Sequence, residues 1–263
     1  MTDEEQTLEH IDYDRIEQEI NDAVAVSLGP RGADVLYDVI ARLGLPAGAV
    51  AIDVGCGAGR QAVELAHRFS FDVLGIDPEP RFEESGESAP ASVSFRSGTA
   101  EEIPTPDASA DLVLYREMLY LVRDLVTILT ECGRVLKPTG RAIVSQLFST
   151  DWLEPEESKR FWGAIEARNA DIEHFERSVA AAGLAVEDVL DLRSETVEWA
   201  EEQDGKAGRE LLAAARLIRD PQRYIARFGR EAYDIKLNDA LWFVYRMIGK
   251  LTQRIYVLRP ASR

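Results

Sequence analysis

The segment AVAIDVGCGAG, residues 49–59, joins a short apolar run to three closely spaced glycines. A continuous apolar run of this length is typical of a strand covered on both faces, and the residues after the glycines resemble the start of a helix. Glycine allows positive φ and lacks the Cβ atom that would keep a ligand away from the backbone. We therefore expect a strand, a ligand-binding loop and a helix in succession, with N–H groups of the loop facing the ligand.

The same alternation continues to about residue 150. Strands are expected at 49–54, 71–76, 92–96, 111–115 and 141–148, and helices at 58–69, near 79–85 and at about 119–136. Strands that alternate with helices predict a doubly wound, Rossmann-like α/β sheet.

The pattern changes after residue 150. Helices are expected at 154–168 and 171–182 and strands at 184–190 and 254–258, which makes seven strands in all. The segment of about 195–250 is predicted to be a helical insertion before the last strand, packed over the carboxyl end of the sheet. Helices are also expected at 3–28 and 32–43. We predict one domain, 1–263, with an N-terminal helical cap (1–45), a cofactor-binding core (46–150) and a substrate half (151–263).

Composition excludes several classes of protein. A net charge of −17 disfavours binding to a phosphate backbone. No run approaches 18 apolar residues, so neither a membrane span nor a membrane partner is expected. The acidic N-terminus does not suit a signal peptide. The two cysteines, Cys56 and Cys132, have no zinc-type spacing. We expect a cytoplasmic protein without a metal.

The glycine loop distinguishes two kinds of nucleoside site. A dinucleotide fingerprint has a third glycine where this chain has Arg60. Asp53 before the loop would repel a pyrophosphate, whereas it suits a ligand with a cationic amino group. The loop therefore favours a sulfonium amino-acid nucleoside.

Several motifs together resemble class I S-adenosylmethionine-dependent methyltransferases. Residues 50–59 resemble the first motif of that family, and GID, residues 75–77, ends the second strand with an acid. GTAEEIP (98–104), DLVLY (111–115) and ECGRVLKPTG (131–140) follow in the family's order. The resemblance is dense over 49–148 and loose over about 170–190 and 252–258. It departs from the family pattern at Thr139, which replaces a glycine, and at Tyr120, where many relatives have histidine.

The resemblance implies S-adenosylmethionine as the cofactor and places a set of residues around it. Asp77 is expected to accept the ribose hydroxyls, although it could instead cap the following helix. Glu101 could contact the adenine edge or be a solvated acid, and Cys56 is expected to be a small filler rather than a nucleophile. The predicted cofactor residues are Asp53, Gly55, Cys56, Gly57, Gly59, Asp77, Pro78, Ala100, Glu101 and Arg116.

The acceptor side is less well defined by sequence. Methyl transfer needs alignment and desolvation, and a base only where the nucleophile carries a proton. By position in the family, Glu117 and Tyr120 are candidate catalytic residues, and Gln146 is a candidate for substrate binding. The alternative for Glu117 is a salt bridge to Arg116.

A basic segment lies within the predicted insertion. Residues 206–230 hold seven basic and two acidic side chains, a local charge of +5 that leaves −22 for the rest. Arg223, Arg227 and Arg230 share one helix face and could bind an anionic substrate through guanidinium forks. The alternative is that this face pairs with the protein's own acidic surface.

The sequence therefore predicts a methyltransferase that acts on a small-molecule acceptor, possibly one with a carboxylate, phosphate or diphosphate, in bacterial specialised metabolism. The acceptor atom stays open among O, N and C. C-methylation of a prenyl-diphosphate-like alkene and a cofactor-binding protein without transfer activity are the alternatives. A small-molecule substrate and no nucleic acid are expected as partners, with the chain a monomer or homodimer.

Overall fold

The computed structural model describes residues 13–79, 81–82 and 89–261, and it divides the chain into two units, Met1–Pro30 and Arg31–Arg263. In the first unit, α1 (Tyr13–Val24) exposes the apolar side chains of Ile20 and Val24. The predicted helix over 3–28 therefore has its residues 3–12 outside the described part. Everything below concerns the second unit.

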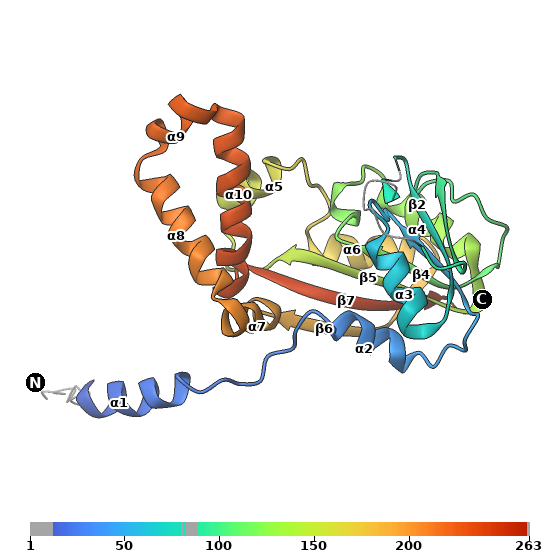
Figure 1. Cartoon of the computed structure of the whole chain (residues 1–263), viewed down its shortest axis with the longest axis horizontal. Helices are drawn as coiled ribbons and strands as arrows, with labels where there is room; N and C mark the ends of the chain where they lie inside the picture. The colour runs from blue at the N-terminus through green and yellow to red at the C-terminus, as the bar shows by residue number, and fades with distance from the viewer. Residues whose placement is uncertain (1–12, 80, 83–88, 262–263) are drawn as a thin grey trace, which may run out of the picture. The chain divides into compact units, whose positions relative to one another are not determined.

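Within the described residues, seven strands form one sheet in the order β3-β2-β1-β4-β5-β7-β6 (Figure 1). The strands are β1 (Val50–Val54), β2 (Asp72–Asp77), β3 (Val93–Ser97), β4 (Ala110–Arg116), β5 (Leu136–Ser149), β6 (Leu184–Arg193) and β7 (Leu251–Pro260). β1 to β5 pair in parallel, and β7 is antiparallel to both β5 and β6. The predicted seven-stranded, doubly wound sheet is confirmed.

Helices cover both faces of this sheet, which explains the continuous apolar runs of its central strands. One core contains α2 (Val35–Arg42) and α3 (Arg60–Phe69), and the other contains α4 (Leu125–Val135) and α6 (Ile172–Ala181). The turn between β1 and α3 therefore lies at the carboxyl edge of the parallel strands, where doubly wound folds bind ligands.

One helix differs from its prediction, and a second cannot be compared with it. The expected helix over 119–136 is interrupted, because one 3-10 turn at Leu119–Leu121 ends before Asp124 starts α4. The Asp124 carboxylate accepts the Thr127 N–H at 3.0 Å, an N-cap that fixes the new start. The expected short helix near 79–85 lies largely outside the described residues.

The predicted insertion lies between β6 and β7, at the carboxyl edge of the sheet. It consists of α7 (Glu195–Asp204), α8 (Lys206–Arg219), α9 (Pro221–Phe228) and α10 (Arg230–Met247). We call α8, α9 and α10 the helical arm, which projects from the sheet with α9 at its far end (Figure 1).

The base of the arm is held by an apolar cluster. Tyr120 and Tyr245 pack there with Phe161 and Trp162 of α5 (Pro155–Gly163). None of the helices in the described part of the chain is both long enough and apolar enough to span a membrane.

Candidate active site

The glycine loop between β1 and α3 adopts the backbone that its sequence requires. Gly55, Gly57 and Gly59 have φ of 76°, 49° and 75°. A Cβ on Gly59 would come within 2.5 Å of the Phe95 ring, and one on Gly55 would lie 3.3 Å from Cγ of Met118. Sterics therefore require a glycine at Gly59, and at both positions the positive φ disfavours a side chain.

Four of the loop's N–H groups donate to acceptors within the protein, whereas the sequence predicted N–H groups that face a ligand. The N–H groups of Gly55 and Cys56 donate to the Ile76 carbonyl at 2.7 and 3.0 Å, and that of Gly59 donates to the Cys56 carbonyl at 2.8 Å. The Gly57 N–H donates to Oδ2 of Asp77 at 3.0 Å. These donors tie the loop to the end of β2, because backbone donors in a tight turn are satisfied locally when acceptors are near.

Asp53 is buried at the end of β1 and has one unused acceptor. The Ala62 N–H bonds to its carboxylate, while Oδ2 has no partner among the described residues. Burial raises the pKa of Asp53 to about 7, although the positive charge of Arg116 opposes this shift. A cationic ammonium placed here would satisfy Oδ2 and favour the ionised form. The site therefore fits the amino-acid end of the expected cofactor.

Asp77 ends β2 beside the same loop. Its Oδ1 accepts the Glu79 N–H at 3.0 Å, so it orders the following turn as well as Gly57. Pro78 is exposed, and its carbonyl accepts the Ser97 hydroxyl at 3.0 Å. The ribose contact of Asp77 stays a prediction. Burial raises the pKa of Cys56 to about 12, which agrees with a filler and not with a thiolate nucleophile.

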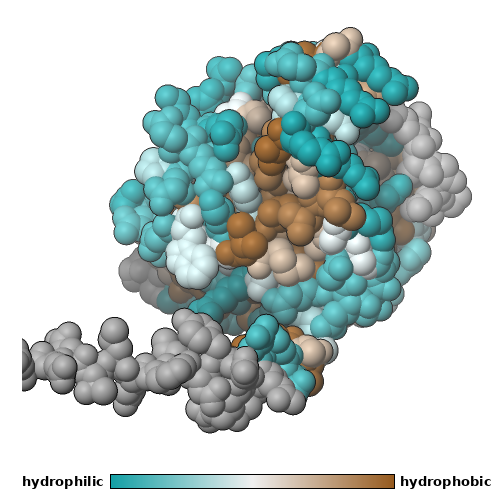
Figure 2. Space-filling view, turned by 90° about the vertical axis from the view of Figure 1, so that its left-hand side faces the viewer, coloured by the Kyte–Doolittle hydropathy of each residue, from teal (hydrophilic) through white to brown (hydrophobic). Residues whose placement is uncertain are grey.

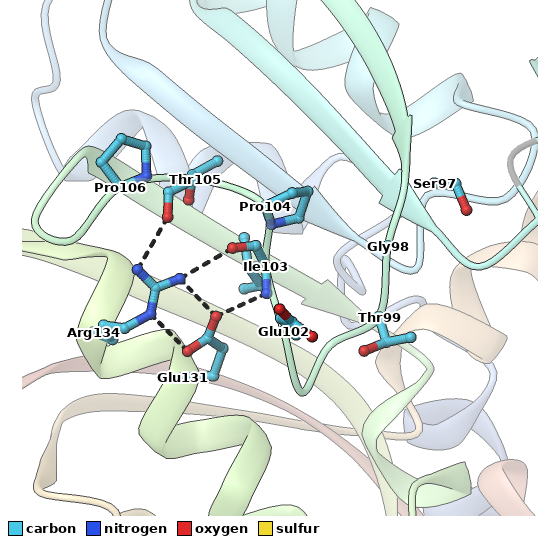
Figure 3. A pocket seen from close by; sticks show the side chains of 10 residues that line it. All are labelled: Ser97, Gly98, Thr99, Glu102, Ile103, Pro104, Thr105, Pro106, Glu131 and Arg134. Atoms are coloured by element: carbon cyan, nitrogen blue, oxygen red, sulfur yellow. Dashed lines mark hydrogen bonds and ion pairs between the residues drawn. The ribbon is translucent and has the colours of Figure 1, made fainter.

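The segment after β3 is held by an ion-pair cluster (Figure 3). Arg134 donates to the carbonyls of Ile103 and Thr105, both at 3.0 Å, and to Glu131 at 2.7 Å. Oε1 of Glu131 also accepts the Ile103 N–H at 2.7 Å. The cluster borders a cavity of about 780 Å³ that Thr99 also lines. It fixes the segment where Ala100 is buried and Glu101 is exposed.

Glu117 follows β4 in a strained backbone conformation, with φ of 52°. Its Oε2 is buried and has no partner among the described residues. Burial raises its pKa to about 7, opposed by the charges of Arg246 and Arg116 and by a hydrogen bond from Tyr120. Arg116 itself donates to Gln61 at 2.6 Å. The alternative of an ion pair between Arg116 and Glu117 is not observed among the described residues.

Arg246 comes from the last turn of α10 and was not predicted. Its Nη2 donates to Gln253 at 2.8 Å and to the Thr196 hydroxyl, while its buried Nε has no partner among the described residues. Arg246 lies in the otherwise apolar run 241–248, and a single cation in such a run is the signal that could have identified it. Glu117 and Arg246 therefore present a free acceptor and a free donor in one buried region.

Gln146, on β5, is buried and also has a free acceptor. Its Nε2 donates to the Asn169 carbonyl at 3.2 Å, and its Oε1 has no partner among the described residues. Asn169 in turn donates to the carbonyls of Leu119 and Val122 at 2.9 and 2.8 Å. Asn169 thus holds the turn that carries Tyr120, a role that no sequence pattern indicated.

An open hollow of about 480 Å³ lies beside Tyr120. Trp242 and Phe243 of α10 and Lys206 of α8 line it together with Ile165. The Trp242 and Tyr120 rings meet edge to face, with centroids 6.0 Å apart. The hollow therefore combines an aromatic surface with the side chains of Lys206, Lys236, Glu210 and Asp239, next to the residue that hydrogen bonds with Glu117.

The three predicted substrate arginines lie elsewhere. Arg223 and Arg227 are on α9 and Arg230 begins α10, and all three are exposed at the far end of the arm (Figure 1). The structure does not bring them together with Glu117, Tyr120 or Gln146.

Comparison with known proteins places this geometry among methyltransferases. Residues 52–144 match the family model described as a methyltransferase domain. A ubiquinone biosynthesis O-methyltransferase from Azorhizobium caulinodans is 35% identical over 103 residues, which are 38% of this chain and 40% of that protein. The O-methyltransferase resE from Aspergillus sclerotiorum is 28% identical over 193 residues, 68% of this chain and 73% of that protein. The match to the first of these relatives thus spans less than half of its length.

Solved structures support the fold. A putative sarcosine dimethylglycine methyltransferase from Galdieria sulphuraria superposes with a TM-score of 0.65 at 20% identity, over 88% of this chain and 84% of that one. At this identity the likeness concerns the arrangement of the sheet and its helices.

Proposed function

We propose that the chain is a class I S-adenosylmethionine-dependent methyltransferase that methylates a hydroxyl oxygen of a small-molecule acceptor. The observation that carries the proposal is Glu117, a carboxylate with a buried free oxygen and a raised pKa at the carboxyl end of β4. The names of the two relatives, both O-methyltransferases, favour oxygen as the acceptor atom.

The residues around the glycine loop would hold the cofactor. The free Oδ2 of Asp53 would accept the ammonium group, Asp77 the ribose hydroxyls, and the segment around Ala100 the adenine. When bound, S-adenosylmethionine supplies an electrophilic methyl group on a sulfonium. Asp53 and Asp77 fix the position of that methyl group, which is the main contribution a protein makes to such a displacement.

Glu117 would act on the acceptor. Oε2 of Glu117 would take up the hydroxyl proton as the acceptor oxygen becomes methylated. A pKa near 7 suits a general base at neutral pH, because about half of the carboxyl groups are ionised there and each still binds a proton well. The Tyr120 hydroxyl would steady the carboxylate by its hydrogen bond.

The hollow beside Tyr120 would admit the acceptor. Tyr120, Trp242 and Phe243 give it an aromatic wall, which favours an acceptor with a flat apolar body. The exposed positions of Arg223, Arg227 and Arg230 give no support to an anionic group at this site.

The test measures transfer of the methyl group from isotopically labelled S-adenosylmethionine to a panel of phenols and aliphatic alcohols. Arenes, alkenes and amines belong to the same panel, so that carbon and nitrogen acceptors are tested as well. We expect labelled ethers, and Glu117→Gln should reduce turnover by about 10²–10⁴-fold while S-adenosylhomocysteine still binds. Glu173→Gln, an exposed glutamate on α6, is the matched control.

Label in carbon or nitrogen products would reject the hydroxyl acceptor. Cofactor binding by calorimetry without turnover on any acceptor would instead support a binding protein. Full activity in Glu117→Gln would remove Glu117 as the base.

A further inference from the structure

The outer side of the helical arm carries a group of large exposed apolar side chains. Leu211, Leu212 and Ile218 on α8 and Phe228 on α9 are each more than half exposed. Figure 2 faces this side and shows a hydrophobic area bordered by hydrophilic residues. Single apolar residues are common on protein surfaces, but a gathered group of them marks an interaction site.

Only some of the apolar residues of α8 pack into the core of the arm. Leu211, Ala215 and Ile218 recur at helical spacing and are exposed, whereas Ala214 and Leu217 on the adjoining side are buried. The apolar side of α8 is therefore wider than the part that is buried in the arm.

Uncompensated positive charge surrounds this group. Arg216, Arg219, Arg223 and Arg227 are exposed, and among the described residues no acidic side chain forms an ion pair with them. The segment 206–230 has a charge of +5 in a chain of −17, so positive charge is concentrated in this part of the arm.

The arm also has an apolar hollow. A hollow of about 390 Å³ between α8, α9 and α10 is lined by Leu217, Tyr224, Phe228 and Tyr233, with Arg216 also at its wall. α9 has no buried residue, and Tyr224, Ile225 and Phe228 lie on one side of it while Arg223 and Arg227 lie on the other. Such an amphipathic helix with arginines on its polar side is typical of helices that bind at a membrane surface.

The charge identifies the kind of partner. A symmetric pairing of two copies through α8 would bring the arginines of both copies together, which like-charge repulsion opposes. An anionic lipid surface accepts a projecting apolar helix and attracts the arginines around it. Because screening limits electrostatic repulsion to about 8–10 Å, the acidic body beyond the base of the arm does not prevent this approach.

We propose that the helical arm docks on an anionic lipid surface through the exposed apolar side chains of α8 and α9 and the arginines that flank them. This goes beyond the proposed methyl transfer and differs from the expectation of no membrane partner, which rested on the absence of a spanning segment. The arm binds at the interface without crossing it, and it does so without cofactor or acceptor.

The test is sedimentation of the full chain with vesicles of phosphatidylcholine alone and with vesicles in which phosphatidylglycerol replaces part of it. We expect binding only to the anionic vesicles, and release as salt is raised. Arg223→Gln with Arg227→Gln should weaken binding by about 30-fold, from about 1 kcal/mol per basic residue near a charged membrane surface. Leu211→Ser with Ile218→Ser should also weaken binding to anionic vesicles.

Two exposed arginines off the arm, Arg42→Gln with Arg177→Gln, give a control with the same loss of charge and unchanged binding. Equal binding to neutral vesicles, no binding to anionic vesicles, or the same loss in the control would each overturn the proposal. So would a wild-type dimer that the arm variants dissociate while vesicles fail to bind, since that result assigns the surface to a second copy. Circular dichroism confirms that each variant is folded, and because no acceptor is used, the outcome is independent of the proposed reaction.

Discussion

Arg246, in the last turn of α10, and Glu117, just after β4, lie close enough for each charge to shift the pKa of the other. The two residues meet because the insertion returns to the sheet at β7, which is separated from β4 only by β5. The end of the helical arm nearest the sheet therefore places Arg246 near Glu117, the proposed general base.

Replacement of Arg246 by methionine should raise the pKa of Glu117 further above 7, because the positive charge that favours the carboxylate is lost. Arg246→Lys keeps the charge and should leave the pKa near 7. Carboxyl ¹³C chemical shifts followed over pH measure this without an acceptor, with Glu117→Gln to assign the signal. Arg254→Met, on the neighbouring strand, is the control. An unchanged pKa of Glu117 in Arg246→Met would show that the charge of Arg246 does not act on Glu117.

Without cofactor, the buried carboxyl of Asp53 should make the free energy of unfolding decrease as pH rises. Its pKa is about 7 in the folded chain against an ordinary value of 3.8, so the folded state binds the proton more tightly. The stabilisation is complete below about pH 4 and is lost as pH rises to 7, roughly 4 kcal/mol at about 1.36 kcal/mol per pKa unit.

Urea unfolding at pH 5 and pH 7.5 measures this effect, and Asp53→Asn should show a smaller decrease than the wild type. The ammonium group of S-adenosylhomocysteine favours the carboxylate. With this ligand bound, the free energy of unfolding of the wild type should therefore fall less between pH 5 and pH 7.5. Equal slopes in wild type and variant would show that Asp53 titrates normally.

Asp77→Ala should weaken binding of S-adenosylhomocysteine by roughly 1–3 kcal/mol, the cost of leaving buried polar partners unsatisfied. The structure adds that Gly57 also loses its acceptor. Calorimetry measures the affinity, and Asp72→Ala, an exposed aspartate at the start of β2, is the control. The same affinity in both variants would place Asp77 outside the cofactor site.

Arg134→Ala should loosen the segment after β3, because Ile103 and Thr105 lose the donor that holds their carbonyls. A hydrogen bond to a charged group contributes about 1.5–3 kcal/mol, so the melting temperature should fall. Hydrogen exchange should increase at residues 103–107, and affinity for S-adenosylhomocysteine should fall with it. Arg177→Ala removes an exposed i,i+4 pair and should change neither. Unchanged exchange at 103–107 would contradict this role.

Local features could be predicted from the sequence. The strand at 50–54, the glycines with positive φ, and the acid that ends β2 were all expected, because hydrophobic periodicity and glycine's backbone freedom act over a few neighbouring residues. The insertion before β7 was expected for the same reason, since its helical pattern interrupts a run of strands.

Features that depend on distant segments required the folded chain. Three donors of the glycine loop, the N–H groups of Gly55, Cys56 and Gly57, bond to Ile76 and Asp77 of the next strand. Arg223 and Arg227 are on the arm's exposed end, although their spacing alone allowed either a pocket or a surface.

The sequence by itself determined the order of the elements and the loop for the nucleoside, because propensity and periodicity are local properties. Only the tertiary structure brought Arg246 to Glu117, since burial and charge at a site depend on which segments pack together. The same packing buried part of the apolar side of α8 and left Leu211 and Ile218 exposed beside it.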